Sequence, residues 1–178
     1  MQIVDLDSDN RERVTQTADL LVRGLGHSWP DLDSALAEVH DCLQPENINR
    51  IAVDVRGHVV GWVGGQPAYD GHAWELHPLV VHPDSQGAGI GRLLVSDFEA
   101  QVKARGGLTI YLGTDDERQQ TSLGGLDVYP DVLGHLARIQ NHDRHPYEFY
   151  QKVGFVIVGV IPDANGFGKP DIIMAKRV

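Results

Sequence analysis

A glycine-rich segment, Gln86-Gly87-Ala88-Gly89-Ile90-Gly91-Arg92, has the composition of a loop that binds phosphate groups. It follows an apolar run over residues 73–81 that predicts a strand, and it leads into a helical periodicity over residues 90–104. Glycine lets the backbone approach a ligand closely, and a helix N-terminus adds N–H groups and positive dipole character. The segment therefore predicts a site for a pyrophosphate.

Two side chains that can exchange protons lie on the strand before this loop. Residues on a strand alternate faces, so Glu75 and His77 are expected on one face. Pro78 donates no hydrogen bond, which predicts a bulge or an edge, and N–H groups near Leu79 could then stabilise an oxyanion. Either side chain alone is more often an ordinary surface contact, but together, just upstream of an anion loop, they favour catalysis.

Other residues with reactive side chains lack suitable partners. Cys42, the only cysteine, lies in an expected amphipathic helix without an evident base, so we interpret it as a packing residue. His135, His142 and His145 fit no standard zinc spacing, and no cysteine pair accompanies them, so no metal site is predicted.

The composition limits the classes of partner. The chain has 178 residues, 42% of them hydrophobic, and one domain over residues 1–178 is expected. Its formal net charge of −10 argues against nucleic acid binding, and it suits a small cationic amine or, alternatively, serves only solubility. The first seven residues lack signal-peptide features, and the apolar run 155–161 is too short to span a membrane. We therefore expect a cytoplasmic protein without membrane contact.

The order of elements predicts a mixed α/β sheet flanked by helices, without the strict alternation of a doubly wound fold. Ser8 or Asp9 is expected to cap the first helix, and Gly57 to turn a hairpin. The helix over 90–104 should bury Leu93, Leu94, Phe98 and Val102. The strands are expected at 2–6, 50–55, 58–66, 73–81, 108–112, 155–161 and 171–176, and later helices at 129–140 and 146–153.

These residues resemble the Gcn5-related N-acetyltransferase (GNAT) superfamily, whose hallmark is an Arg/Gln-x-x-Gly-x-Gly/Ala loop after a splayed strand. The chain is more closely similar to the aminoglycoside 6′-N-acetyltransferases of the chromosomal Gram-positive type. The similar blocks cover residues 74–81, 105–116, 145–155 and 158–176. The departures lie in 117–128, in 131–144 and in the N-terminal helices, which leaves the range of acceptors open.

The resemblance implies a mostly antiparallel sheet with a splay between the fourth and fifth strands. It implies direct transfer of an acetyl group from acetyl-coenzyme A to the 6′-amino group of an aminoglycoside, within a ternary complex. The pantetheine arm would run along Leu79-Val80-Val81, with the pyrophosphate in the 86–92 loop. The enzymes of this family are commonly homodimers, so a dimer is expected.

Residue roles also follow from the resemblance. Glu75 corresponds to a base or substrate anchor, His77 to a supporting histidine, and the Leu79 N–H to the group that polarises the thioester. Tyr150 matches a tyrosine that could protonate the departing thiolate, or it only packs. The acceptor would contact Trp29, Tyr69, Asp115 and, within the same acidic segment, Asp116, unless that segment is simply solvated.

Two alternatives stay open at this point. The acceptor could instead be a polyamine or a basic protein segment, which would also suit an acidic pocket. The chain could also bind coenzyme A without catalysis, although the presence of Glu75, His77 and Tyr150 weighs against that reading.

Overall fold

A computed structural model describes residues 1–178, and these form two compact units. The first unit comprises Met1–Ile110 with Val178, and the second comprises Tyr111–Arg177. The single domain expected over residues 1–178 stays a prediction.

The first unit is an antiparallel sheet with helices on both faces. Its strands are β1 (Gln2–Asp5), β2 (Ile48–Val53), β3 (Val59–Ala68) and β4 (Ala73–Val81), each paired with the next along the chain. The long helices are α1 (Arg11–Leu25), α2 (Leu32–Cys42) and α3 (Ile90–Ala104), and short 3₁₀ turns η1 (Tyr69–Gly71) and η2 (Pro83–Ser85) flank β4.

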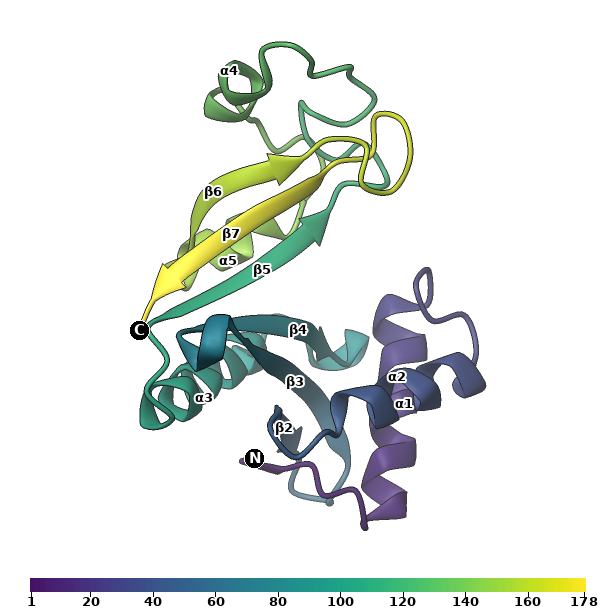
Figure 1. Ribbon diagram of the computed structural model, residues 1–178. Helices are drawn as coiled ribbons and strands as arrows, with labels where there is room; N and C mark the ends of the chain where they lie inside the picture. The colour runs from purple at the N-terminus through teal and green to yellow at the C-terminus, as the bar shows by residue number, and fades with distance from the viewer. The chain divides into compact units, whose positions relative to one another are not determined.

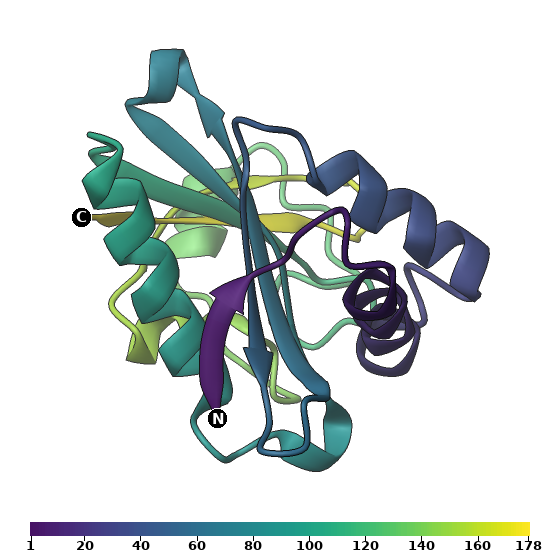
Figure 2. The same cartoon turned by 90° about the horizontal axis from the view of Figure 1, so that it is seen from below.

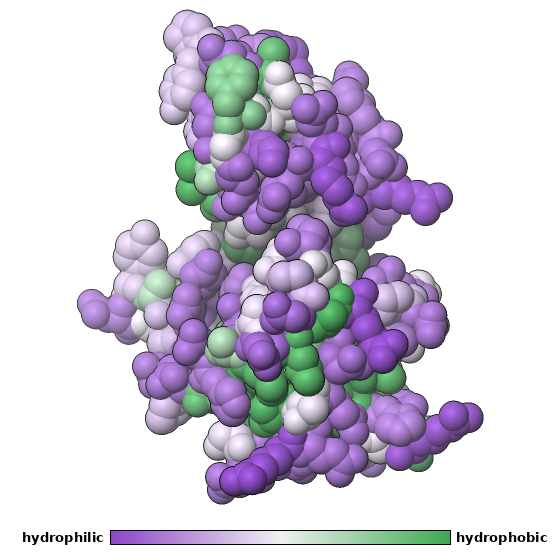
Figure 3. All heavy atoms as spheres, turned by 90° about the vertical axis from the view of Figure 1, so that its right-hand side faces the viewer, coloured by the Kyte–Doolittle hydropathy of each residue, from purple (hydrophilic) through white to green (hydrophobic).

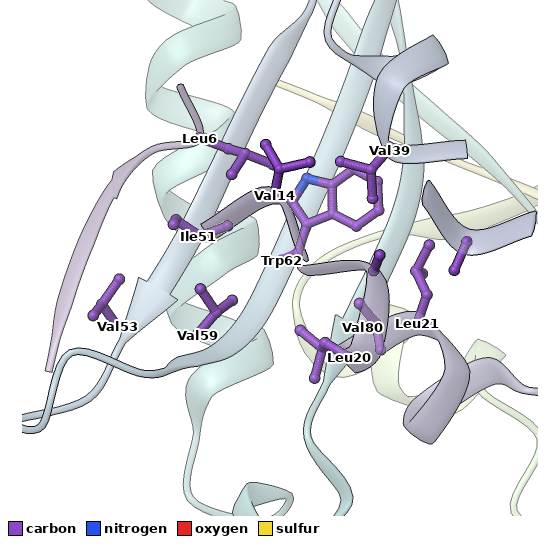
Figure 4. Close-up of a cluster of buried hydrophobic side chains, with 12 residues drawn as sticks. Leu6, Val14, Leu20, Leu21, Val39, Ile51, Val53, Val59, Trp62 and Val80 are labelled. Atoms are coloured by element: carbon purple, nitrogen blue, oxygen red, sulfur yellow. The ribbon is translucent and has the colours of Figure 1, made fainter. Parts of the chain in front are cut away.

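The two faces of β3 bury different helices. Trp62 packs in a cluster with residues of α1 and α2, which Figure 4 shows gathered around its ring. A Cβ at the neighbouring Gly61 would instead lie within 3.0 Å of Leu94 and Ile90 of α3. Because neighbouring strand residues point to opposite faces, α3 lies across the sheet from α1 and α2, as Figure 2 shows. The sheet thereby fixes β4 between two packed layers.

The first unit confirms most of the predicted elements and corrects two details. Strand β4 and helix α3 have the predicted bounds, and Gly57 turns the β2–β3 hairpin with φ of +90°. Leu93 is 46% exposed, so its predicted burial was wrong; Val95 is buried instead, because the apolar stripe runs through 94, 95, 98 and 102.

The cap predicted for the first helix was also wrong. Neither Ser8 nor Asp9 caps α1; the Asn10 side chain does, by accepting a hydrogen bond from the Arg13 N–H at 3.2 Å. The Asp9 N–H donates to the Asp7 carboxylate at 2.9 Å, so these residues form a turn before the helix. Several neighbouring residues, among them Asp9 and Asn10, can cap a helix, and the sequence alone did not show which of them would do so.

The second unit has three strands and two short helices. Strand β5 (Thr109–Asp115) begins at the end of the first unit, and its order with β6 (Val156–Ile161) and β7 (Asp171–Arg177) is β5-β7-β6. The helices are α4 (Val132–Ala137) and α5 (Tyr147–Lys152), and all of these elements are labelled in Figure 1. The strand expected at 108–112 therefore continues to Asp115.

The helix expected over 129–140 is shorter, because its C-terminal residues pair elsewhere. The Gln140 N–H donates to the Ser122 hydroxyl at 3.0 Å, and the Ser122 N–H donates to the Gln140 carbonyl at 2.9 Å. Asn141 forms an isolated bridge with Thr121. These contacts connect two loops that the sequence pattern could not relate.

The surface is mainly polar. Figure 3 shows hydrophilic residues over most of the face in view, with small hydrophobic patches between them. No helix has both the length and the apolar character that crossing a bilayer would require. No group of three or more His, Cys, Asp or Glu side chains is placed to share a metal ion.

Candidate functional site

A bulge in β4 lies at the centre of the candidate site. The register of β4 against β3 shifts between Leu76 and Leu79, so that His77 and Pro78 together face a single residue, Gly64. The bulge predicted from Pro78 is therefore confirmed. Such an irregularity re-aims side chains and changes which backbone groups the ladder uses.

Two glycines of β3 make room for this bulge. A Cβ at Gly64 would lie 2.6 Å from the His77 carbonyl oxygen, and one at Gly65 would lie 2.5 Å from the Glu75 carbonyl oxygen. The Cβ at Gly65 would also meet the Phe98 ring of α3 at 2.3 Å. The close approach of the two strands therefore requires glycine at both positions.

Glu75 and His77 alternate with buried residues along β4, as expected for side chains that share the less buried face. Gln66 lies opposite Glu75 in the register, and its Nε2 donates a hydrogen bond to Glu75 Oε2 at 3.0 Å. A neutral amide donor orients a carboxylate without removing its charge. Glu75 is thus held in place from β3.

His77 contacts a carboxylate that the sequence did not indicate. Its Nε2 lies 3.3 Å from Oε1 of Glu38 on α2, and its ring centroid lies 6.1 Å from that of Trp29. Glu38 is separated from His77 by two strands along the chain, so no local spacing related them. The structure therefore brings together Trp29 and His77, two of the site residues that the sequence predicted.

A pocket of about 120 Å³ opens beside this group on the α2 side of the sheet. Its walls combine polar and apolar surface and come from the C-terminal half of α2, from the turn after it, and from β3 and β4. The lining residues are Glu38, Asp41, Cys42, Asn47, Gly65, Gln66 and His77.

Cys42 has the environment of an unreactive thiol. Its Sγ lies 3.4 Å from Glu38 Oε1, and burial together with the Glu38 charge raises the pKa of the thiol to about 12. The thiolate is the nucleophilic form of cysteine. Cys42 is therefore poorly suited to carry an acyl group, in line with its interpretation as a packing residue.

The 86–92 loop has the backbone geometry that anion binding requires. Gly87 and Gly89 adopt φ of +77° and +84°, and a Cβ built at either would meet nothing within 4 Å. Helix α3 starts at Ile90 without a side-chain cap, so its first N–H groups have no partner from a cap. The Gln86 amide folds back and donates to the Val81 carbonyl at 3.2 Å. The open space and the uncapped helix fit a pyrophosphate.

Tyr69 lies apart from the bulge along the chain. It belongs to η1, which precedes β4, whereas the bulge lies in the middle of that strand. Its side chain is 78% exposed and its φ is +50°. A contact between Tyr69 and an acceptor stays a prediction.

The remaining expected residues belong to the second unit. Tyr150 of α5 is buried, with ring centroids 5.2 Å from Phe149 and 5.7 Å from Phe155, and burial raises the pKa of its phenol. Asp115, at the end of β5, is exposed, and its carboxylate accepts a hydrogen bond from the Asn165 amide. Its carboxylate thus remains accessible to solvent.

Asp116 differs from its neighbour. It is fully buried, and its carboxylate accepts hydrogen bonds from the Gln120 N–H, the Thr121 N–H and the Thr121 hydroxyl, at 2.6, 2.9 and 2.7 Å. Three donors from one segment fix the loop that follows β5. These contacts favour a structural role for Asp116, and its predicted contact with an acceptor stays a prediction.

Comparison with known proteins gives both a family match and full-length structural likeness. The model of the acetyltransferase (GNAT) family matches residues 14–124. A crystal structure of an aminoglycoside 6′-N-acetyltransferase complexed with coenzyme A is 45% identical, with a TM-score of 0.92 over 99% of this chain and 97% of that one. The enzyme from Enterococcus faecium is also 45% identical, with a TM-score of 0.90 over the same shares.

Curated relatives match over a shorter stretch. An acetyltransferase of Pectobacterium atrosepticum is 42% identical over 62 residues, which is 35% of this chain and 43% of the relative. The match thus spans less than half the length of that curated relative. It adds support for the acetyltransferase assignment, whereas the structural likeness extends over nearly the whole chain.

Proposed function

Because the chain belongs to the GNAT acetyltransferase family, we propose that it transfers the acetyl group of acetyl-coenzyme A to the 6′-amino group of an aminoglycoside. The observation that carries this proposal is the 45% identity, over 99% of the chain, to an aminoglycoside 6′-N-acetyltransferase. Coenzyme A is bound in that related structure, which supports acetyl-coenzyme A as the cosubstrate here.

The 86–92 loop and the end of β4 would hold the cosubstrate. The pyrophosphate would accept hydrogen bonds from N–H groups of the loop, where Gly87 and Gly89 leave open space. The pantetheine arm would lie along Leu79-Val80-Val81 in the manner of an added strand. The Leu79 N–H, directly after the bulge, would polarise the thioester carbonyl and stabilise its oxyanion.

The acceptor amine must lose a proton to react. Glu75, oriented by Gln66, would take that proton directly or through water. The nitrogen lone pair attacks the thioester carbon, the C–N bond forms, and the C–S bond breaks with its electron pair leaving on sulfur. The Tyr150 phenol would protonate the departing thiolate; burial raises the pKa of this phenol, which makes it a weaker acid than an exposed tyrosine.

The acceptor's other ammonium groups need counter-charges. Asp115 offers an exposed carboxylate, Trp29 offers an aromatic face, and Tyr69 offers an exposed phenol. Ammonium groups bind favourably to carboxylates and to the faces of aromatic rings. His77, fixed beside Trp29, would support the acceptor's position.

We expect a homodimer. Strand β6 is the last strand in the order β5-β7-β6, and Val156, Val158 and Ile161 on it are 61%, 57% and 52% exposed. An edge strand with exposed apolar side chains is a surface that a second copy could cover.

Thiol release from acetyl-coenzyme A with two matched acceptors tests the proposed function. Kanamycin carries a 6′-amine, whereas paromomycin carries a 6′-hydroxyl. We expect turnover with kanamycin only. Equal turnover with both would contradict selectivity for the 6′-amine. Turnover with polyamines or basic peptides, but with neither aminoglycoside, would show that the acceptor is one of those amines and is not an aminoglycoside.

A further inference from the structure

Glu38 lies where three side chains of the candidate site meet. Its Oε1 is 3.3 Å from His77 Nε2 and 3.4 Å from Cys42 Sγ, and its side chain is 24% exposed. The Trp29 ring is tilted by 51° against the His77 ring, with 6.1 Å between the two centroids. Glu38 therefore contacts His77, and His77 lies beside Trp29, the other residue of this group that the resemblance assigns to the acceptor side.

The charge of Glu38 determines which hydrogen bonds its carboxylate can form. The hydrogen bond from His77 is the largest cause that lowers the pKa of this carboxyl, and Cys42 and Trp29 add smaller contributions against the cost of burial. Glu38 is therefore ionised at neutral pH, and an ionised carboxylate only accepts hydrogen bonds. A ring nitrogen that contacts it must carry a proton, so when His77 holds a single ring proton, that proton lies on Nε2.

The support beneath Glu38 is rigid. The Cys42 carbonyl, one turn further along α2, accepts hydrogen bonds from the Asn47 and Asn49 side-chain amides at 3.0 and 2.7 Å. Asn49 in turn accepts a hydrogen bond from the buried Trp62 indole at 3.2 Å. The C-terminal end of α2 is thereby attached to β2 and β3, so the Glu38 carboxylate has a fixed position relative to β4.

We propose that Glu38 is a positioning residue of the acceptor site: it selects the Nε2–H tautomer of His77 and fixes that ring beside Trp29. This proposal rests on the proposed function, because it places His77 and Trp29 next to the acceptor. Glu38 itself takes up no proton from the acceptor and forms no bond with it. Its loss should reduce productive orientation of the acceptor and leave the binding of the cosubstrate along Leu79-Val80-Val81 and the 86–92 loop unchanged.

A measurement without any acceptor tests the first half of the proposal. In protein with ¹⁵N-labelled histidine, the ring-nitrogen chemical shifts identify which nitrogen of His77 carries the proton. We expect the Nε2–H form in the native protein and in Asp33→Asn, which removes an exposed carboxylate of the same helix. We expect a mixture of tautomers in Glu38→Ala. An unchanged tautomer in Glu38→Ala would overturn the proposal.

A double-mutant cycle tests the second half. Loss of a charge-assisted hydrogen bond in Glu38→Ala should lower kcat/KM for kanamycin about tenfold while KM for acetyl-coenzyme A is unchanged. In the His77→Ala background the same substitution should have little further effect, because the two residues act through one contact. Glu38→Gln keeps an acceptor oxygen and should recover most of the activity.

The outcomes separate the two proposals. Fully additive losses in the cycle, or an equal loss in Asp33→Asn, would overturn a role of Glu38 through His77. A rise in KM for acetyl-coenzyme A alone would also overturn it. If the native enzyme turned over no aminoglycoside, the proposed function would fail, and the tautomer measurement would still decide whether Glu38 positions His77.

Discussion

At the scale of single residues, the candidate chemistry depends on how neighbours hold each side chain. Glu75 and His77 could be found in the sequence because they share a strand next to a glycine-rich loop. The sequence did not indicate their partners, because Gln66, which contacts Glu75, and Glu38, which contacts His77, belong to other elements of the fold. The sequence thus predicted which groups are candidates for the chemistry, and the structure showed which neighbours orient them.

Glu75→Gln tests the base. The amide cannot take the amine proton but keeps the shape of the side chain, so we expect kcat to fall by about 10²-fold or more. The melting temperature and KM for acetyl-coenzyme A should change little. Glu46→Gln, at an exposed position, serves as the matched control in the same thiol-release assay. Unchanged turnover in Glu75→Gln would remove Glu75 from the mechanism.

Tyr150→Phe separates an acid from a packing residue. The ring contacts with Phe149 and Phe155 remain, so the variant should fold. If the phenol protonates the thiolate, kcat should fall by about 10²-fold. Steady-state kinetics with kanamycin give the answer, and wild-type turnover would show that Tyr150 only packs.

The Cys42 thiol should be unreactive in the folded protein. Burial and the Glu38 charge raise its pKa to about 12, so little thiolate exists at neutral or mildly alkaline pH. We expect slow labelling by iodoacetamide at about pH 8 in native protein and fast labelling after unfolding in urea. Mass spectrometry follows the reaction, and equally fast labelling in both states would contradict this environment.

At the scale of elements, the pattern of residues predicted β4 and α3 closely because each has a strong period and clear ends. Pro78 predicted the bulge because proline has no N–H to donate to the neighbouring strand, which interrupts the regular hydrogen bonding between strands. The helix at α4 was predicted too long because residues 140–143 pair with the loop at 120–122. Long-range pairing of this kind leaves no periodic signal in the sequence.

Two glycines in left-handed turns provide a matched test of the anion loop. Gly89 and Gly57 have φ of +84° and +90°, and both would leave an added Cβ in open space. Alanine at either position should cost about 1–2 kcal/mol of stability through backbone strain. Only Gly89→Ala should raise KM for acetyl-coenzyme A, because only Gly89 belongs to the loop that we propose holds the pyrophosphate. Equal KM values in both variants would contradict the assignment of the loop.

At the scale of the whole molecule, the family predicted from the residues is confirmed by the family model and by structural likeness over nearly the full chain. The GNAT fold is confirmed in the same way, with a TM-score of 0.92. The net charge of −10 suits a cationic acceptor, although charge alone could not select one. We expect the range of acceptors to depend on loops such as 117–128, whose contacts the sequence pattern did not reveal.

The assembly can be tested at β6. Val158→Lys places a charge on an exposed apolar edge strand, so we expect it to convert a dimer into a monomer. Leu133→Lys, on α4 and 75% exposed, is the control and should leave the dimer intact. Light scattering coupled to size-exclusion chromatography measures the mass. A Val158→Lys dimer would contradict an interface at β6.

The position of the transferred acetyl group tests the central claim most directly. Two-dimensional NMR of the product from kanamycin and acetyl-coenzyme A identifies the acylated nitrogen. The proposed function predicts one acetamide, on the 6′ nitrogen. An acetyl group on any other nitrogen or on oxygen, or recovery of unmodified kanamycin, would contradict it.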